Sequence, residues 1–463
     1  MIANTSLVFA EAVHAALREH LFPGDGLEAS ALLFCARLEG SRTKLLVKEW
    51  IPVPYEACKV RLVNAITWPG EYLERAIDLA EKESLTIILT HSHPGGFLEF
   101  SQVDDESDAI SVRALCQAIE GAHGSAIMVD SGEMRARLYD SLMVPSLIDL
   151  VTVVGHDIRY WWADSGPERP PMAFTSKMSK YLARLVVAVV GVSGTGSIVA
   201  EQVARLGFGQ VILIDHDHVE LKNLNRILNS TVEDAIAKAP KTEMFAQAIT
   251  RMRGENVAVS INDSLATRRA VLAAAGADVI FSCVDTKEAR MIADRLAAAF
   301  LIPLFDVGVT IPTYKAVDGH DAIIDVAGRI DYVRPGGPTL EERGVYTPGS
   351  LQAEYLLRVN KDAHEEQVDL GYFKGVQEEA PSVITLNMRA ASACVSEFIA
   401  RAFPFREEPN SNYARTRFSL SGCDEDYCRE DTWPIHANPL LAAGCSEPLL
   451  GIPSLGRRQS SAA

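Results

Sequence analysis

A glycine-rich turn between a buried strand and a helix is the feature that most constrains the fold of this chain. Residues 185–190 form a valine-rich apolar run typical of a buried strand, and the motif Gly191-Val192-Ser193-Gly194-Thr195-Gly196-Ser197 follows at once. The pattern predicts a helix over 197–206 and a second strand over 211–214. Strand, helix and strand in this order predict a βαβ unit and therefore a parallel sheet.

Polar residues after this unit indicate a nucleotide site. Asp215 lies 24 residues after Gly191, where a carboxylate accepts hydrogen bonds from ribose hydroxyls, and a dehydrogenase would use it in the same way. Asn223, Arg226 and Lys241 add polar and basic groups that a triphosphate requires and a hydride-transfer site does not. Solvated loop positions are the alternative for these three residues.

A second carboxylate is expected at the same edge of the sheet. Asp285 follows a predicted strand over 279–284, and ligands of parallel sheets bind at the carboxyl ends of the strands. A magnesium ion could be held there. Alternatively, Asp285 caps the helix predicted over 286–300.

The first 155 residues predict a separate domain of mixed α/β structure. The expected elements are a helix over 7–21, strands over 31–36 and 45–50, a helix over 72–83 and a strand over 85–89. Loop residues rich in Gly and Pro follow at 155–171. We therefore divide the chain into a first domain (1–155), a linker (156–174), a second domain (175–405) and an irregular C-terminal extension (406–463).

A metal-binding pattern follows the strand over 85–89. His91 and His93 are alternate residues of an extended segment, so both imidazoles can face one ion, and Asp104 supplies a carboxylate ten residues after Pro94. Two imidazoles and one carboxylate suit Zn²⁺ and leave a fourth position for water. Glu28 precedes the strand over 31–36, which could pair beside the strand over 85–89, and this makes Glu28 the best placed candidate for the general base.

Each element of this pattern also has a plainer interpretation. Ser101 and Asp104 form a capping-box-like start for a helix that runs to about residue 120, and this interpretation can hold together with the metal site. A lone His-x-His is more often an ordinary surface or core pair. The whole string His-x-His-Pro, six residues, Ser-x-x-Asp is far less expected by chance.

Glu28, His91-Ser92-His93-Pro94 and Ser101-Gln102-Val103-Asp104 resemble the signature of the JAMM (JAB/MPN) metalloproteases, which remove ubiquitin or ubiquitin-like proteins or trim their C-termini. The resemblance covers about residues 5–150. It implies that His91, His93 and Asp104 bind Zn²⁺, that Glu28 activates the water, and that Ser101 hydrogen-bonds the oxyanion. Glu39 and Glu49 are alternatives for the base.

Residues 175–403 resemble the ubiquitin-activating adenylyltransferases, a family that includes activators of sulfur-carrier proteins. The motifs that carry the resemblance are 191–197, 215–226, Lys241 and 284–286. It implies a Rossmann-like domain in which ATP lies over Gly191, Gly194 and Gly196, Asp215 takes the ribose, and Asp285 positions Mg²⁺. The phosphates would be held by Asn223, Arg226 and Lys241, and we expect Arg226 to be a catalytic residue as well.

The same resemblance implies a reaction and partners. The C-terminal glycine carboxylate of a ubiquitin-like or sulfur-carrier protein would attack the α-phosphate, pyrophosphate would leave, and the domain would form a homodimer. Ser193 replaces the family's usual glycine, which is tolerable if its φ is negative. Thr339 and Glu342 stand where relatives often carry Cys-x-x-Cys, so that zinc half-site is absent.

The cysteines of the C-terminal extension leave the thiol step open. Cys423, Cys428 and Cys445 lie near His436, but their spacing fits no standard zinc knuckle, and unpaired cysteines are the better interpretation. A thioester through Cys423 or Cys428 is one route, and direct release of the adenylate to an acceptor is another.

Composition narrows the partners and the compartment. Lys and Arg number 44 against 61 Asp and Glu, and the resulting net charge of −17 argues against nucleic acid. No apolar run approaches the roughly 18 residues of a membrane helix, and scattered single cysteines suit a reducing compartment. We therefore expect a cytoplasmic protein. The two family resemblances imply that it belongs to a prokaryotic ubiquitin-like pathway.

The sequence thus predicts an α/β protein in which a JAMM-type metalloprotease domain precedes an adenylyltransferase domain. The expected function is cleavage of a ubiquitin-like protein combined with adenylation of its C-terminal glycine, with a conjugating enzyme as a further partner. Alternatives are sulfur-carrier activation for thiocarboxylate synthesis, or a non-catalytic JAMM scaffold on an activating domain.

Overall fold

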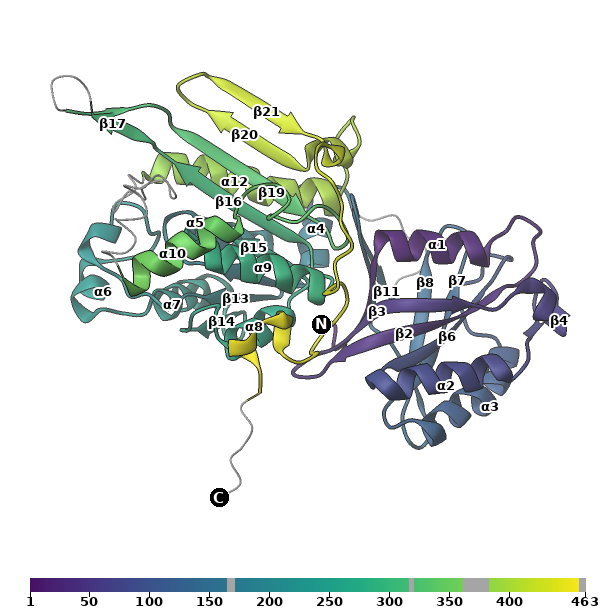
Figure 1. Cartoon of the computed structure of the whole chain (residues 1–463). Helices are drawn as coiled ribbons and strands as arrows, with labels where there is room; N and C mark the ends of the chain where they lie inside the picture. Colours follow the sequence, from purple (N-terminus) through teal and green to yellow (C-terminus); the bar gives the residue numbers. More distant parts are fainter. Residues whose placement is uncertain (165–170, 316–319, 361–382, 458–463) are drawn as a thin grey trace.

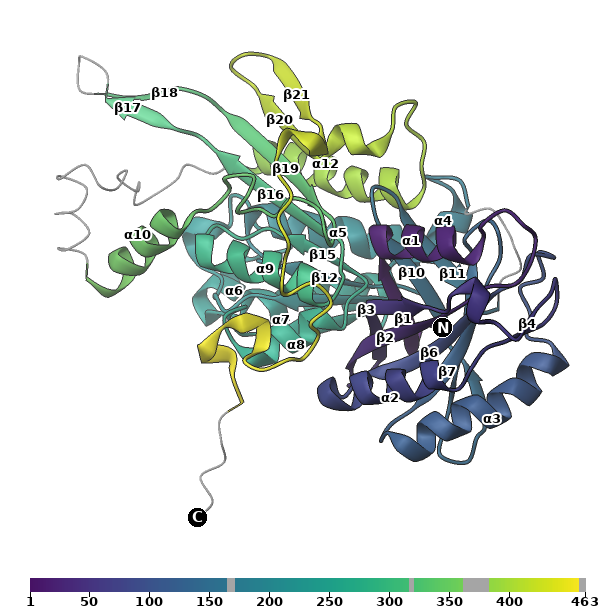
Figure 2. The same ribbon diagram turned by 45° about the vertical axis from the view of Figure 1, so that its right-hand side comes forward.

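The computed structural model describes residues 1–164, 171–315, 320–360 and 383–457 (Figures 1 and 2). Two large sheets, one in the N-terminal part and one in the C-terminal part, organise the chain. The mixed α/β class expected from the sequence is confirmed.

The N-terminal sheet has nine strands in the order β11-β10-β1-β3-β2-β6-β7-β8-β9. Helix α1 packs on one face through Leu17 and Leu21, and α2 and α3 cover the other face. The strands are β1 (Thr5–Ala10), β2 (Ser30–Leu38), β3 (Thr43–Pro52), β6 (Thr86–Ser92), β7 (His123–Met128), β8 (Met134–Tyr139), β9 (Pro145–Leu147), β10 (Leu150–Val154) and β11 (Ile158–Trp162). The helices are α1 (Glu11–Leu21), α2 (Glu71–Glu83) and α3 (Gln102–Ala118).

The C-terminal sheet has eight strands, of which the first five are parallel and the last three antiparallel. Their order is β14 (Ala258–Ile261), β13 (Gln210–Ile214), β12 (Val186–Val190), β15 (Val279–Ser282), β16 (Leu304–Thr310), β19 (Ala327–Val333), β20 (Arg415–Ser419) and β21 (Asp424–Cys428). Helices α5 (Gly194–Leu206), α7 (Lys241–Arg253) and α12 (Ile384–Ala402) pack on one face, and α8 (Arg268–Ala275) and α9 (Lys287–Ala299) on the other.

Smaller elements complete the described chain. They are helices α4 (Ser176–Leu182), α6 (Val232–Ala237) and α10 (Pro348–Val359), the strand pairs β4 (Val60–Arg61) with β5 (Ile66–Thr67) and β17 (Thr313–Lys315) with β18 (Asp321–Ile323), and the 3₁₀ helices η1 (Tyr55–Ala57), η2 (Leu221–Asn223), η3 (Asn410–Tyr413), η4 (Glu430–Thr432), η5 (Leu449–Gly451) and η6 (Pro453–Leu455).

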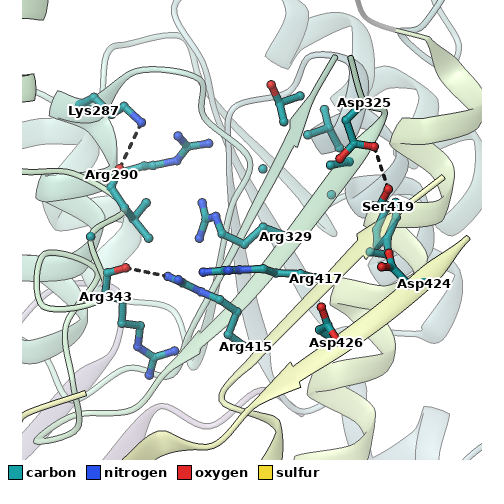
Figure 3. Close-up of a pocket in the computed structure, with 18 residues that line it drawn as sticks. Lys287, Arg290, Asp325, Arg329, Arg343, Arg415, Arg417, Ser419, Asp424 and Asp426 are labelled. Atoms are coloured by element: carbon teal, nitrogen blue, oxygen red, sulfur yellow. Dashed lines mark hydrogen bonds between the residues drawn. The ribbon is translucent and has the colours of Figure 1, made fainter. Parts of the chain in front are cut away.

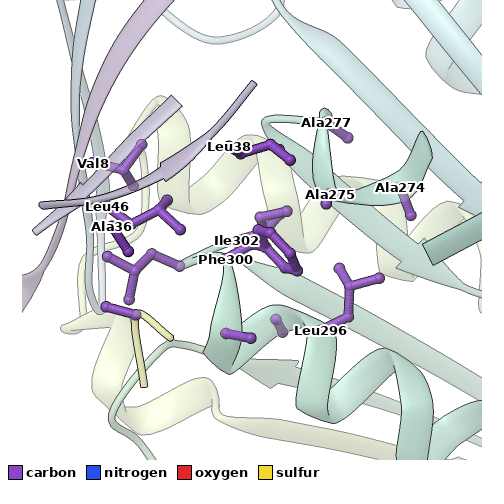
Figure 4. Close-up of a cluster of buried hydrophobic side chains, with 14 of the residues drawn as sticks. Val8, Ala36, Leu38, Leu46, Ala274, Ala275, Ala277, Leu296, Phe300 and Ile302 are labelled. Atoms are coloured by element: carbon purple, nitrogen blue, oxygen red, sulfur yellow. The ribbon is translucent and has the colours of Figure 1, made fainter. Parts of the chain in front are cut away.

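The two sheets share one hydrophobic cluster. Side chains of β1, β2 and β3 in the N-terminal sheet contact the C-terminal ends of α8 and α9, the helices that pack on the C-terminal sheet (Figure 4). Beside this cluster, Arg42 donates two 3.0 Å hydrogen bonds to the carboxylate of Asp278, and both residues are buried. The ammonium group of Lys44 donates to the carbonyls of Ala275 and Ala277. The domains are therefore joined by a contact that combines apolar packing with a buried ion pair.

Most predicted elements are confirmed, but the predicted helix over 7–21 is wrong in its first four residues, because α1 begins at Glu11. Residues 5–10 form strand β1, which lies between β3 and β10 with parallel pairing to both. Leu7 and Phe9 are fully buried on one side of the sheet, and Val8 is buried on the other. Pairing with strands that are distant in sequence therefore decides the structure here.

The predicted linker and C-terminal extension also need correction. Strand β11 lies inside the range 156–174 and pairs antiparallel with β10, with alternate residues Ile158, Tyr160 and Trp162 buried. The extension after residue 405 is not irregular throughout, because β20 and β21 continue the C-terminal sheet. Further on, the backbone N–H of Ala442 donates to the carbonyl of Ala298, so this segment packs on α9.

Candidate active sites

The residues of the expected metal site converge beside β6. His91 lies in β6 and His93 directly follows the strand, while Asp104 lies in the first turn of α3. The Nε2 atoms of the two histidines are 3.0 Å apart, and the carboxylate of Asp104 lies 3.0 Å from Nε2 of His91 and 3.5 Å from Nε2 of His93. Ligands of a tetrahedral zinc ion, with bonds of about 2.0–2.1 Å, lie about 3.3 Å apart. The donor atoms therefore fit one such ion.

Neighbouring groups hold these donors in place. The carbonyl of Phe97 lies 2.8 Å from Nδ1 of His93. This contact orients the imidazole so that its Nε2 faces His91 and Asp104. Ser101 caps α3: its hydroxyl accepts from the N–H of Asp104, and Asp104 accepts from the N–H of Ser101 at 2.6 Å. The capping box expected from the sequence is thus confirmed, and it fixes the Asp104 carboxylate next to the histidines.

Glu28 is the glutamate that the fold brings to the histidines. It precedes β2, whose Ser30 pairs opposite His91, and its carboxylate groups with the imidazoles of His91 and His93 within 4.8 Å. Glu39 instead pairs with Arg37, and Glu49 is exposed on β3. Burial raises the pKa of the Glu28 carboxyl above its ordinary value, although the nearby histidines lower it.

The electrostatics of the cluster favour a charged Asp104. Burial acts to raise the pKa of Asp104, but hydrogen bonds with His91 and His93 outweigh burial and hold the pKa far below its ordinary value. A cavity of about 300 Å³ adjoins the cluster and is lined by Glu28, His91 and Asp104 together with Trp68 and Val103. A negative carboxylate facing two imidazoles beside an open cavity is suited to a cation and a bound substrate.

The glycine-rich turn has the close packing that the motif predicts. Gly191 has a φ of +83°, and a Cβ on Gly196 would lie 1.7 Å from the carbonyl oxygen of Gly191. A Cβ on Gly194 would meet Asn387 of α12 at 2.3 Å and the Arg226 side chain at 3.2 Å. Ser193 has a φ of −97°, so the expectation that serine is tolerated there is confirmed.

Asp215 joins the turn to the next strand. One of its carboxylate oxygens accepts from the N–H of Val192 at 2.7 Å, and the other accepts from the N–H of Asp217 at 2.9 Å. Burial raises the pKa of Asp215, although Lys241 lowers it. The carboxylate is thus fixed at the end of β13, beside the glycine-rich turn.

The expected phosphate-binding residues occupy three different environments. Lys241 is buried at the start of α7 and donates to Asp217 at 2.7 Å. Asn223 is buried and accepts from the N–H of Glu220, within η2. Arg226 is partly exposed and donates to the carbonyl of Lys222. The side chain of Arg226 packs against Gly194 of the turn.

Asp285 lies at the same edge of the C-terminal sheet. Val190 of β12 pairs in parallel with Ser282 of β15, so the turn at Gly191 and the segment before Asp285 leave the sheet side by side. Asp285 is exposed, and Thr286 rather than Asp285 caps α9. The alternative that Asp285 caps this helix is therefore wrong, and its carboxylate is not used in that cap.

Sequence reasoning missed residues that support both sites. Asn387 was not expected near the turn, although a polar residue in a helix as apolar as α12 is a signal for it. Asp108 of α3 was also missed: it accepts hydrogen bonds from Arg137, Ser125 and Tyr139 and so ties α3, which carries Asp104, to β7 and β8. These contacts join elements that are distant in sequence.

Comparison with known families defines the class of each domain. Residues 10–139 match the family of prokaryotic homologs of the JAB domain, and residues 169–342 match the ThiF family. The chain therefore has a JAB-like domain at its N-terminus and a ThiF-type, E1-like Rossmann domain in its C-terminal part.

Individual relatives resemble a segment of the chain. Ubiquitin-like modifier-activating enzyme 5 of Drosophila pseudoobscura pseudoobscura is 33% identical over 159 residues, which is 32% of this chain and 37% of that protein. The enzyme of the same name from Aedes aegypti is 32% identical over 159 residues, with the same 32% and 37% coverage. The matched segment thus spans little more than a third of the length of these relatives.

Solved structures of MccB also resemble the chain. E. coli MccB with ATP has a TM-score of 0.41 and 16% identity, covering 58% of this chain and 68% of that one. MccB in complex with N-formylated MccA has a TM-score of 0.42 and 17% identity, covering 58% of this chain and 70% of that one.

In the part of the chain that the structure describes, no helix combines the length and apolar composition needed to cross a membrane.

Proposed function

We propose that this protein is a bifunctional enzyme that cleaves a ubiquitin-like protein in a zinc-dependent reaction and adenylates the C-terminal glycine of the same protein with ATP. The convergence of His91, His93 and Asp104 beside Glu28 is the observation that carries the proposal, because it supplies three metal ligands and a base. The JAB-like and ThiF-type matches support it.

In the peptidase site, His91, His93 and Asp104 would hold Zn²⁺, which supplies Lewis-acid polarisation and a water of lowered pKa when it is bound. Glu28 takes the proton of the attacking water and returns it to the leaving amine. Its buried position suits this role, since burial favours proton uptake by a carboxylate. Ser101, which precedes α3, is the candidate donor to the oxyanion.

In the adenylation site, ATP would lie over the glycine-rich turn, with its ribose on Asp215 and its phosphates toward Asn223, Arg226 and Lys241. The bare backbone at Gly191, Gly194 and Gly196 permits a phosphate to approach the N–H groups at the start of α5. The exposed carboxylate of Asp285 would hold Mg²⁺. A bond forms between the glycine carboxylate and the α-phosphorus, and the bond to pyrophosphate breaks.

The partners and the setting follow from this function. We place the enzyme in the cytoplasm of a bacterium, as a homodimer through the ThiF-type domain, with a conjugating enzyme as the acceptor. The adenylate would pass to a thioester on Cys423 or Cys428 or directly to that acceptor. Sulfur-carrier activation is the second candidate, and a thiocarboxylate in place of a conjugate would identify it. A non-catalytic JAB-like scaffold would bind the substrate without cleaving it.

Elemental analysis tests the metal site. The wild-type protein should contain one zinc per chain, and His91→Ala together with His93→Ala should remove it, since two of three ligands are lost. Glu28→Gln should retain the zinc but lose cleavage of a ubiquitin-like precursor. Full zinc in the double variant would place the metal elsewhere, with the tail cysteines as the next candidates.

Exchange of pyrophosphate into ATP tests the second site. Exchange should require a ubiquitin-like partner with a free C-terminal glycine, and Asp285→Ala should abolish it while cleavage continues. Exchange that persists in Asp285→Ala would contradict the role of this carboxylate. Loss of both activities together would indicate misfolding instead.

A further inference from the structure

A cavity lined by basic side chains lies in the C-terminal half, apart from the glycine-rich turn. It has a volume of about 600 Å³ and lies between the start of α9 and strands β16, β19 and β20 (Figure 3). Its six basic residues are Lys287, Arg290, Arg329, Arg343, Arg415 and Arg417. None of the residues assigned to ATP lines it.

Buried carboxylates balance these cations only in part. Asp306 pairs with Arg290 and Arg329, and Asp331 pairs with Arg329, Arg343 and Arg415, so two carboxylates serve four arginines. Both carboxylates are fully buried behind the cavity.

Two basic side chains of the cavity form no ion pair with any residue that the structure describes. One is Arg417. The other is Lys287, whose ammonium group donates to the carbonyl of Val345 and whose backbone N–H donates to Glu354. The buried Nε of Arg290 lies 3.5 Å from Asp306, within ion-pair range, but forms no hydrogen bond in the described chain. Burial, together with Arg290 and Arg415, lowers the pKa of Arg329 to about 10, as expected for crowded positive charge.

The rim of the cavity has the opposite charge. Asp325, Asp424 and Asp426 line its outer side, and Asp426 lies across from Arg417 in the β20–β21 pair. Asp424 and Asp426 are exposed, as is Arg417, so water screens these charges more than it screens the buried Arg290, Arg343 and Arg415. An extended polyanion would meet these carboxylates, whereas a compact anion can pass them and reach Arg290, Arg329 and Arg417, whose guanidinium groups Figure 3 shows turned toward one space.

We propose that this cavity binds a compact oxyanion of the phosphate class, either a free ion or a single phosphoryl group on a larger ligand. Guanidinium groups present paired N–H donors that match tetrahedral oxyanions. The site is separate from the proposed ATP site, although Lys287 lies two residues after Asp285.

Calorimetric titration of the full-length protein with inorganic phosphate in chloride buffer tests this proposal. We expect saturable binding that Lys287→Ala combined with Arg417→Ala weakens by about tenfold or more, because two charged donors are lost. Neither residue has an ion pair in the described chain, so the variant should fold. Arg417→Ala alone serves if the double variant has a lowered melting temperature.

A control variant tests for a general effect of lost positive charge. Arg429→Ala removes an exposed arginine whose side chain pairs with Asp431 among the described residues, so this variant should bind phosphate as the wild type does. Absence of saturable binding in the wild type would overturn the proposal, as would equal weakening by Arg429→Ala and by the cavity variant.

Competing ligands identify the source of the anion. A phosphoserine peptide that displaces phosphate indicates a phosphoryl group on a protein, and displacement by pyrophosphate alone indicates a free ion. If the protein binds an acidic peptide that carries no phosphate but does not bind inorganic phosphate, the proposal that the ligand is a phosphate-class oxyanion is contradicted.

Discussion

His156 shows how one side chain can connect three parts of the chain. Its Nδ1 lies 3.1 Å from the carboxylate of Glu11 in α1, and its Nε2 lies 2.8 Å from that of Glu430 in the C-terminal extension. Arg334, which follows β19, also pairs with Glu430 at 2.7 Å. Hydrogen bonds with Glu11 and Glu430 raise the pKa of His156 to about 9.

This elevated pKa predicts a pH-dependent contribution to stability. Because the folded pKa of His156 exceeds its ordinary value of 6.5, the contribution is fully present below pH 6.5 and is lost as the pH rises through about 9. The imidazole is partly exposed, so we expect roughly 1 kcal/mol. Melting temperatures of wild type and His156→Gln should differ at pH 6.5 and converge above pH 9. A difference that grows with pH would contradict the assigned charge.

The turn from β12 into α5 is the element on which the proposed nucleotide site depends. Gly196→Ala should remove ATP binding and destabilise the protein by about 1–3 kcal/mol, since its Cβ would overlap the carbonyl oxygen of Gly191. Gly276→Ala is the matched control, because its Cβ would approach Ala273 no closer than 3.4 Å. Fluorescent-nucleotide binding and thermal melting measure both effects. Normal binding by Gly196→Ala would place the nucleotide elsewhere.

Elements with local sequence signals could be predicted, and those defined by distant pairing could not. The turn at Gly191, the capping box at Ser101 and Asp104, and α9 each follow from neighbouring residues. Strand β1 could not be recognised, because its valine and leucine also suit a helix and its partners β3 and β10 come from distant segments. The grouping of Glu28 with His91 likewise depends on the β2–β6 register, which no local pattern contains.

At the scale of the whole molecule, the two domains should unfold together. Arg42 and Asp278 are buried at the contact between them, with exposed side-chain fractions of 7% and 5%. Arg42→Ala leaves the Asp278 carboxylate without its cation, and the loss should be about 3–5 kcal/mol. Asp278→Asn retains an acceptor for the N–H of Val186 and should cost less.

Differential scanning calorimetry measures this coupling. We expect one cooperative transition in the wild type and two separated transitions in Arg42→Ala. Two transitions already present in the wild type would show that the contact does not couple the domains.

The central claim is that both sites act on the same protein, with cleavage before activation. Only a free terminal carboxylate can attack the α-phosphate, so a precursor with residues beyond its glycine must first be trimmed. The direct measurement is adenylate formation from such a precursor. Wild-type protein should form adenylate after a lag, and Glu28→Gln should form none unless it receives the trimmed protein. Normal adenylation of the extended precursor by Glu28→Gln would contradict the account.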